Sequence, residues 1–315
     1  MNVLVTGGAG FIGSHLIEAL LKKGYRVDCF DNFNNYYDPT IKRSNIESFL
    51  HHSAFMLYEG DILDFTLLQE LFSQRSYHMI VHLAARAGVR PSIQQPFLYQ
   101  KVNVEGTLNL LECCRRFDVD KFICASSSSV YGANKKVPFS EDDFVDNPIS
   151  PYAATKKAAE LLCYTYTHLY QISTTNLRFF TVYGPRQRPD MAIHKFTKLI
   201  DEGKPIPVYG MGKSKRDYTY IDDIIQGIEA SMAHCNGYRL YNLGESKTID
   251  LLSLIKLIEK ALGKNAILDY QPHQPGDVPI TYADISKAQK EINYNPQTLI
   301  KDGIEKFVNW YKSRR

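Results

Sequence analysis

A glycine-rich turn between an apolar run and a helix most constrains the fold of this chain. Residues 2–6 (NVLVT) predict a strand and residues 12–23 have apolar residues at helical spacing, so TGGAGFIG lies between them. In such a turn Gly7 permits the tight bend, Gly10 lets the backbone approach a pyrophosphate, and Gly13 lets the helix pack on the sheet. The helix start, with Phe11 and Ile12, then presents unpaired N–H groups to the phosphates. The pattern predicts a dinucleotide site.

A carboxylate follows where such a site requires one. The second predicted strand, 25–30, ends at Asp31, about 20 residues beyond the glycines, where an acidic residue binds a ribose. An anion there disfavours a 2′-phosphate, so the sequence predicts NAD rather than NADP as the cofactor. Further cofactor contacts are expected at the ends of neighbouring strands, from Asn32, Asp61, Ile62, Leu83, Ala84 and Ala85. The small residues among them fit close approach of a ligand, and they fit packing equally well.

Strands and helices alternate along the first 180 residues. This βαβ spacing, with near-continuous apolar strands, predicts an α/β fold, a Rossmann doubly wound parallel sheet covered on both faces. We expect residues 1–180 to form the NAD-binding domain, with some later segments returning to it, and 181–315 to form mainly a smaller C-terminal substrate-binding lobe. Further strands are expected at 54–58, 78–83, 120–125, 173–180 and 239–243, helices at 64–74, 96–117, 152–170, 192–202, 221–233, 250–261 and 298–312, an exposed loop leading into a helix at 32–45, and a loop at 84–92.

Composition excludes several classes of function. Net charge is +3, from 37 basic and 34 acidic residues, which is too small to indicate a nucleic-acid partner. The six cysteines have no metal-ligand spacing, and most lie in apolar or helical runs, as buried free thiols of a reducing cytoplasm do. We therefore expect no metal site and a cytoplasmic location. The N-terminus shows no signal sequence, and no apolar stretch approaches ~20 residues, so we expect no membrane association.

The stretch from Ala125 to Lys156 carries groups suited to acid–base chemistry. Tyr152 and Lys156 lie four residues apart at the start of a predicted helix, which stacks the phenol and the ammonium on one face. A nearby cation favours a phenolate, and the hydroxyls of residues 126–129 end the preceding strand. The pair alone is equally typical of an amphipathic helix with a surface lysine, so the rest of the chain must decide.

The order of motifs along the chain decides between these two interpretations of Tyr152 and Lys156. The chain carries TGGAGFIG, Asp31, Asp61, HLAA, SSSSVYG, YAATK, RFFTVYGPRQRPDM and RDYTYIDD. With these it resembles, over essentially its whole length, the extended short-chain dehydrogenases/reductases, in the branch of sugar-nucleotide epimerases and dehydratases. Within that branch NNYYDPTIKR, AARAGVRPS and FFTVYGPRQRPDMA are most similar to UDP-glucuronate 4-epimerases, and UDP-glucose 4-epimerases are the nearest alternative.

The resemblance implies an NAD-dependent isomerase that oxidises C4 of a UDP-sugar transiently, forms a 4-keto intermediate and reduces it again on the opposite face. It implies that Tyr152 is the catalytic base. It also implies that Lys156 binds the nicotinamide ribose and favours the phenolate form of Tyr152. Ser127 occupies the position whose hydroxyl, in the family, hydrogen-bonds the sugar 4-OH. Lys101 and Asn103 lie behind the site and are candidates to support the cofactor, although Asn103 fits a structural hydrogen bond better. The family pairs the helices at 96–117 and 152–170 in a homodimer.

One departure from the family points to the substrate. The related 4,6-dehydratases carry an Asp-Glu pair directly after the Ser/Thr, and related uronate decarboxylases carry a glutamate in the second position. Here both positions are hydroxyls, Ser128 and Ser129, so elimination lacks its acid and base. Uncharged hydroxyls can bind a carboxylate that an acidic side chain would repel. This favours conversion of UDP-glucuronate to UDP-galacturonate; a UDP-glucose 4-epimerase, or a protein that binds NAD and sugar nucleotide without turnover, are the alternatives.

The resemblance also implies where the UDP-sugar is held. Thr181 joins the serines at the sugar, and Arg188 is a candidate for the carboxylate or the diphosphate, with Arg186 as its competitor. Arg216 lies in a segment that the family uses for the diphosphate, and residues 206–209 in one that holds the uracil. Gln274 stands where related epimerases often carry a second phosphate-binding arginine, so that contact is in doubt, and Asp277 is an alternative contact to the nucleotide.

Overall fold

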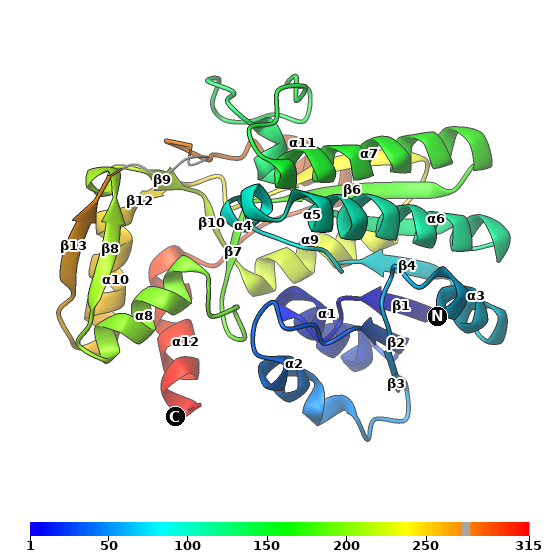
Figure 1. Cartoon of the computed structure of the whole chain (residues 1–315), viewed down its shortest axis with the longest axis horizontal. Coiled ribbons are helices and arrows are strands. Elements are labelled where there is room, and N and C mark those ends of the chain that lie inside the picture. The colour runs from blue at the N-terminus through cyan, green and yellow to red at the C-terminus, as the bar shows by residue number, and fades with distance from the viewer. Residues whose placement is uncertain (273–277, 315) are drawn as a thin grey trace.

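A computed structural model describes residues 1–272 and 278–314 of the chain. Its centre is a seven-stranded parallel sheet in the order β11-β6-β5-β4-β1-β2-β3 (Figure 1). The strand order reverses between β1 and β4, as in a doubly wound sheet, so the predicted Rossmann fold is confirmed. The strands are β1 (Asn2–Thr6), β2 (Arg26–Asp31), β3 (Phe55–Glu59), β4 (Met79–His82), β5 (Lys121–Ser127), β6 (Ser173–Phe179) and β11 (Tyr238–Leu243).

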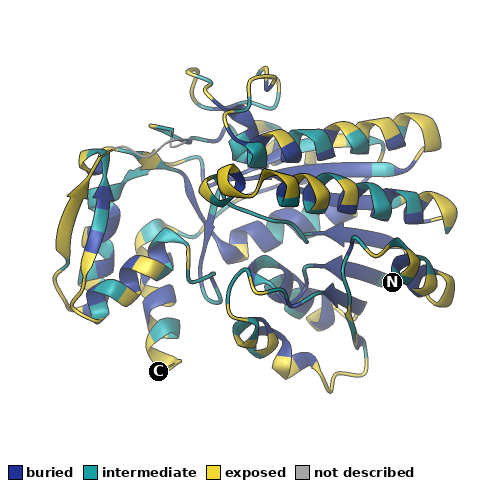
Figure 2. Cartoon of the chain, viewed as in Figure 1, coloured by how far each residue is buried: buried dark blue, intermediate teal, exposed yellow. Residues whose placement is uncertain are grey.

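Each face of the sheet is covered by helices. Alternate residues of β1 enter two separate cores, Val3 and Val5 on one face and Leu4 on the other. Figure 2 shows the strands buried between helices whose outer faces are exposed. Burial on both faces explains why the strands are continuous apolar runs. One face is covered by α1 (Phe11–Lys22) and α9 (Ile221–Ala233), and the other by α3 (Phe65–Gln74), α6 (Gly106–Arg116) and α7 (Pro151–Tyr170).

The predicted helix at 96–117 is interrupted. It consists of α5 (Pro96–Gln100), a π-helical turn η2 (Lys101–Glu105) and α6. Apolar spacing did not reveal this turn, because a π-bulge changes the winding over one turn and not the composition. The bulge lies beside α7, and Asn103 is buried within it.

The C-terminal part forms a lobe of short pairs of strands and helices, drawn left of the sheet in Figure 1. Helix α10 packs between α8 and α12. The chain also returns to the sheet here, because β11 pairs with β6 and α9 packs on α1. The pairs of strands are β7 (Thr181–Tyr183) with β10 (Tyr218–Tyr220), β8 (Pro205–Tyr209) with β13 (Ile267–Gln271) and β9 (Lys215–Arg216) with β12 (Ile249–Asp250), and the helices are α8 (Ala192–Asp201), α10 (Leu251–Leu262), α11 (Ser286–Ile292) and α12 (Ile300–Ser313).

Three local predictions were wrong or incomplete. The loop expected at 84–92 contains α4 (Val89–Gln94), since Pro91 lies in the first turn of a helix, where a proline is tolerated. The segment at 32–45 leads into α2 (Pro39–Ile46) as expected, but most of its residues before that helix are buried or half-buried. Strand β13 and helix α11 had no periodic signal and were missed. Within residues 1–272 and 278–314, none of the helices combines the length and the apolar character that a membrane crossing needs.

Candidate active site

The glycine turn has the conformation that a pyrophosphate cradle needs. Gly7 has φ +67°, and a Cβ on it would lie 2.7 Å from the backbone nitrogen of Ala84, so no other residue fits. A Cβ on Gly13 would lie 2.3 Å from the Gly7 oxygen. The turn therefore places the start of α1, with Phe11 and Ile12, directly at the carboxyl end of β1, while Gly10 bonds back to Gly7.

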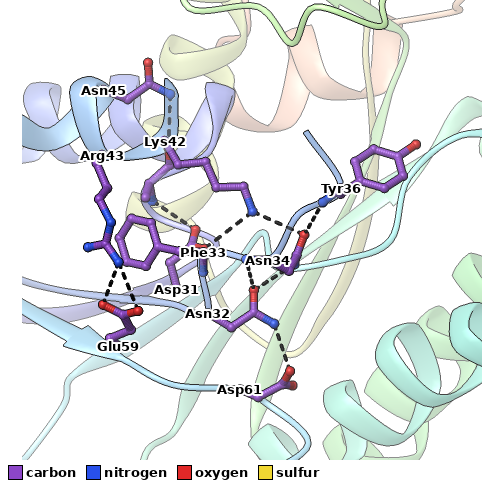
Figure 3. A network of polar contacts seen from close by, with 11 residues as sticks. Asp31, Asn32, Phe33, Asn34, Tyr36, Lys42, Arg43, Asn45, Glu59 and Asp61 are labelled. Atoms are coloured by element: carbon purple, nitrogen blue, oxygen red, sulfur yellow. Dashed lines mark hydrogen bonds and ion pairs between the residues drawn. The ribbon is translucent and has the colours of Figure 1, made fainter. Parts of the chain in front are cut away.

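Asp31 lies beside this turn at the end of β2. Its carboxylate accepts hydrogen bonds from the backbone N–H groups of Ala9, at 3.2 Å, and Phe33, at 2.9 Å (Figure 3). The Nζ of the buried Lys42 lies 3.9 Å from the same carboxylate. Burial raises the pKa of Asp31, while Lys42 and the two N–H groups oppose that rise. An ionised carboxylate has about four acceptor sites, so two backbone bonds leave capacity for ribose hydroxyls.

The neighbouring strand end completes this part of the pocket. Asn32 donates a 2.8 Å hydrogen bond from Nδ2 to the carboxylate of Asp61, which follows β3. The carbonyl of Ile62 accepts from the side chain of Asn109 on α6, at 3.0 Å. Asp31 and Asn32 at the end of β2 thus lie beside Asp61 and Ile62, which follow β3.

The segment after β4 is fixed by a chain of hydroxyls and one histidine. Because Thr107 Oγ1 donates to the carbonyl of Asn103, at 2.6 Å, it accepts from His82 Nε2, at 3.1 Å. His82 Nδ1 then accepts from Thr6 Oγ1 at 2.7 Å. Burial, followed by the charge of Lys156, lowers the pKa of His82 to about 3, so the ring is neutral.

This series of hydrogen bonds holds the segment of Leu83, Ala84 and Ala85 beside the glycine turn. Leu83 N donates to the carbonyl of Thr6, at 3.1 Å, and the Ala84 backbone packs on Gly7. A side chain at position 7 would clash with the Ala84 backbone, so Gly7 is needed for this close packing of the two strand ends.

Asn103 fastens the next residues to the catalytic helix. Its amide exchanges two hydrogen bonds with the backbone of Arg86, at 2.8 and 3.0 Å, and its Nδ2 also reaches Thr155 Oγ1 at 3.1 Å. The role found for Asn103 is therefore a structural hydrogen bond, the better of its two expected roles. Lys101, at the start of the same π-turn, is exposed.

Ser127, Tyr152 and Lys156 are brought together where β5 ends and α7 begins. Ser150 caps α7, which carries Tyr152 in its first turn and Lys156 one turn later on the same face. Lys156 is buried and donates a 2.8 Å hydrogen bond to the carbonyl of Ala125. Ser127 Oγ accepts from Ser129 N at 3.1 Å, and the Tyr152 ring meets Tyr99 edge-on at 6.2 Å. The structure thus places the three residues on two elements that pack together, β5 and α7, and their catalytic roles stay a prediction.

A buried ion pair lies under this cluster. Glu160 on α7 binds Arg178 on β6 through two 2.9 Å contacts, and Ser126 Oγ donates to the same carboxylate at 2.6 Å. Ser126, expected only to end a strand, therefore joins β5 to α7. Sequence reasoning missed Glu160 and Arg178, because the signal for a buried pair is non-local.

Ser128 and Ser129 line a small cavity between the start of α7 and the C-terminal lobe. The described residues that line it are uncharged, and they include Val89 of α4 and Thr281 of the lobe. Thr281 was missed, since it lies in an irregular segment without a motif. Thr181 begins β7, where its N–H donates to the carbonyl of Asp217 at 3.0 Å.

The two arginines of the segment after β7 differ in their surroundings. Arg186 donates to Glu18 on α1 at 2.6 Å, next to a 2.9 Å hydrogen bond from His15 Nε2 to the carbonyl of Pro185. Arg186 therefore docks this segment on the sheet domain. Arg188 binds Asp190 through Nε and Nη2, at 3.0 and 2.8 Å, and its guanidinium lies over the ring of Tyr36.

The remaining candidates lie in the C-terminal lobe. Arg216 belongs to β9 and is half-buried, and its Nη1 donates to the carbonyl of Lys215 at 2.9 Å. Gln274 and Asp277 lie outside the described residues. A larger cavity, of about 690 Å³, lies at the amino ends of β5, β6 and β11. Ligands of open α/β sheets bind at the carboxyl ends, so this cavity is not the candidate site.

Fold and site together define an extended short-chain dehydrogenase/reductase. The chain belongs to the GDP-mannose 4,6 dehydratase family of that class, whose model matches residues 4–307.

Individual proteins with known names show which members of this class the chain is similar to. The chain is 47% identical over 310 residues to a UDP-glucuronate 4-epimerase of Thermodesulfobacterium geofontis, which covers 98% of this chain and 95% of that protein. The crystal structure of UDP-glucuronic acid 4-epimerase from Bacillus cereus, in complex with UDP-glucuronic acid and NAD, superposes with a TM-score of 0.94 at 41% identity and covers 100% of both chains. UDP-glucose 4-epimerase from Thermotoga maritima, with UDP-glucose, has a TM-score of 0.92 at 32% identity, covering 100% of this chain and 99% of that one.

Proposed function

We propose that this chain is an NAD-dependent 4-epimerase that converts UDP-glucuronate to UDP-galacturonate. The observation that carries the proposal is the run of hydroxyls at Ser127, Ser128 and Ser129 at the end of β5, of which Ser128 and Ser129 line an uncharged cavity at the start of α7, the helix that carries Tyr152. Elimination from C5 and C6 needs an acid and a base that these positions lack. Similarity to UDP-glucuronate 4-epimerases at 41–47% identity supports the same substrate.

The residues of the cradle fit NAD. A side chain at Gly7 or Gly13 would clash with the backbone that forms the cradle. Asp31 offers acceptors to a ribose, and its negative charge disfavours a 2′-phosphate. When bound, NAD supplies the oxidant and the reductant for C4. The residues we assign to it are Gly7, Gly10, Phe11, Ile12, Gly13, Asp31, Asn32, Asp61, Ile62, Leu83, Ala84, Ala85, Lys101, Tyr152 and Lys156.

Proton transfer belongs to α7 and the end of β5. The Tyr152 phenolate takes the proton of the sugar 4-OH, and Ser127 hydrogen-bonds the same oxygen. Lys156, held by the Ala125 carbonyl, brings a positive charge to the buried site and favours the phenolate. The same phenol returns the proton when C4 is reduced on its other face.

The carboxylate must be held, because a 4-keto uronate is a β-keto acid that loses CO₂ readily. Ser127, Ser128, Ser129 and Thr181 can keep the C5–carboxylate bond out of alignment with the ketone. Arg188 adds a charge-assisted contact, and Arg216 binds the diphosphate. Turning the keto sugar over requires that few of these contacts be permanent.

The assembly and location follow the family. We assign residues 1–180 mainly to NAD and 181–315 mainly to the UDP-sugar. Exposed apolar side chains on the outer faces of α5 and α7, among them Phe97 and Leu161, support a homodimer through these helices. Six free, buried thiols support the cytoplasm as the compartment.

The decisive experiment incubates the protein with UDP-glucuronate and observes the sugar by NMR. We expect UDP-galacturonate, and no activity from Tyr152→Phe. Turnover of UDP-glucose alone would identify the alternative epimerase. Binding of NAD and UDP-glucuronate without turnover would identify a non-catalytic protein, and accumulation of a UDP-pentose would mean that the carboxylate is not held. Full activity of Tyr152→Phe would refute the mechanism.

A further inference from the structure

Tyr36 lies beneath two guanidinium groups from separate loops. It belongs to the segment between β2 and α2, and its ring is 5.4 Å from the guanidinium carbon of Arg86 and 5.2 Å from that of Arg188. Arg86 follows β4 in the sheet domain, and Arg188 follows β7, in the segment leading to α8. The face of an aromatic ring attracts cations, so one side chain steadies both arginines.

The hydroxyl of Tyr36 fixes the ring in place. It donates a 2.6 Å hydrogen bond to the carbonyl of Ala87, which also accepts from the buried Tyr99. Gly88 follows with φ +99°, and a Cβ on it would lie 3.1 Å from the Tyr36 oxygen. The loop after β4 is thus shaped to receive this phenol.

The backbone of Tyr36 is tied to the cofactor pocket. Its N–H donates to Asn34 Oδ1 at 3.0 Å, and Lys42 Nζ donates to the same oxygen at 3.3 Å (Figure 3). Asn34 in turn donates to Asn32, which binds Asp61. The residues that form the adenosine end of the pocket therefore also determine where the Tyr36 ring lies.

Arg188 keeps hydrogen-bond donors that its contact with Asp190 does not use. Asp190 occupies Nε and Nη2, and a guanidinium has five N–H donors, so further donors remain for another anion. Burial raises the pKa of Tyr99, and Arg188 is near enough to oppose that rise. The hydroxyls of Tyr36 and Tyr99 share the Ala87 carbonyl, and the ring of Tyr99 meets that of Tyr152, so a continuous set of side-chain contacts runs from Arg188 to Tyr152.

We propose that Tyr36 is a positioning residue for substrate selection: its ring holds Arg188 where that guanidinium binds the sugar carboxylate, and its loop ties this arginine to the NAD pocket. This inference rests on the proposed function. Tyr36 does not touch the reacting atoms, and it acts through Arg188.

The test measures binding of UDP-glucuronate, UDP-glucose and UDP to the NAD-loaded protein by calorimetry, in a Tyr152→Phe background that prevents turnover. Tyr36→Leu should narrow the preference for UDP-glucuronate over UDP-glucose about tenfold and leave UDP binding unchanged. Tyr36→Phe keeps the ring and should retain most of the preference. Tyr58→Leu removes another tyrosine that contacts an arginine, Arg75, outside the site, and it should change nothing.

A double-mutant cycle distinguishes positioning from general loosening. If Tyr36 acts through Arg188, Tyr36→Leu has no further effect on the preference once Arg188→Met is present. An additive effect would refute the proposal, as would a Tyr36→Leu variant that keeps the parent's preference. NAD content and melting temperature check the fold, and Tyr36→Met serves as a longer, more flexible non-aromatic replacement if Tyr36→Leu unfolds. A parent protein without preference for UDP-glucuronate would refute the carboxylate assignment itself, and this inference with it.

Discussion

Ser126 donates a 2.6 Å hydrogen bond to Glu160, so the strand that ends in Ser127 is fastened to the helix that carries Tyr152. A second contact runs the other way, from Lys156 Nζ to the carbonyl of Ala125. Two bonds between β5 and α7 thus set the position of the serine hydroxyl relative to the phenol, and one of them belongs to a residue without an expected role in the chemistry.

Glu160→Gln should destabilise the protein strongly. It removes the carboxylate that pairs with the buried Arg178, whose Nη1 already has no hydrogen-bond partner among the described residues, so we expect a loss of about 3–5 kcal/mol in the free energy of unfolding. Urea denaturation of the NAD-loaded protein measures it. The exposed Arg43–Glu59 pair provides the control, since Glu59→Gln should cost less than about 1 kcal/mol. Equal, small effects of both substitutions would contradict this account.

Ser128→Asp should act on one substrate more than on another. A carboxylate at this position repels the C6 carboxylate of UDP-glucuronate but not the hydroxymethyl group of UDP-glucose. We expect kcat/KM for UDP-glucuronate to fall at least about 100-fold, which is about 2.7 kcal/mol, with a much smaller effect on any UDP-glucose turnover. Ser128→Ala controls for the lost hydroxyl. Equal losses on both sugars would mean that Ser128 does not face C6.

The local patterns of the sheet domain were sufficient to predict its fold. The run NVLVT, the glycine turn and the end of the second strand coincide with β1, the loop and β2 to within one residue, because burial on both faces makes parallel strands continuous and apolar. The positions of Ser127, Tyr152 and Lys156 could be predicted because one helix and the carboxyl end of one strand contribute all three.

Features that depend on distant partners could not be predicted. The polar segment at 32–37 was expected to be exposed, yet its asparagines bond to one another, to Asp61 and to Lys42. From the sequence alone, the helix face that carries Glu160 resembles a solvated one, because its partner Arg178 lies on a different element, β6. The π-turn at Asn103 likewise leaves no mark on apolar spacing.

Substitution of Arg186 should affect the stability of the protein, whereas substitution of Arg188 should affect substrate binding. Arg186→Gln breaks a contact to Glu18 that docks the segment after β7, so it should lower the free energy of unfolding by about 1 kcal/mol and leave KM unchanged. Arg188→Gln removes a charged donor and should raise KM for UDP-glucuronate about tenfold or more. Thermal unfolding and steady-state kinetics measure the two effects. The reverse pattern would exchange their assigned roles.

His15 should make the fold sensitive to mild acid. Burial, followed by the charge of Arg186, lowers its pKa from 6.5 to about 4. Between these values the unfolded chain binds a proton at His15 that the folded chain does not, so the free energy of unfolding falls as pH falls through this window, by at most about 1.4 kcal/mol per pH unit. His15→Gln can still donate to the Pro185 carbonyl but does not titrate. Its urea denaturation midpoint should depend less on pH between 6.5 and 4 than the midpoint of the parent does. Toward pH 8 the difference between the two midpoints should become constant.

The outer face of α7 should be required for dimerisation. Leu161 and Tyr164 are both 55% exposed there, which is unusual for large apolar side chains of one helix. In an isologous interface each substitution occurs twice, so Leu161→Glu buries two carboxylates in the proposed interface and should weaken the dimer at least about 100-fold. Sedimentation velocity at micromolar concentration measures this. Leu50→Glu, at a 46% exposed position outside that face, should leave the dimer intact, and a parent protein that sediments as a monomer would exclude the interface.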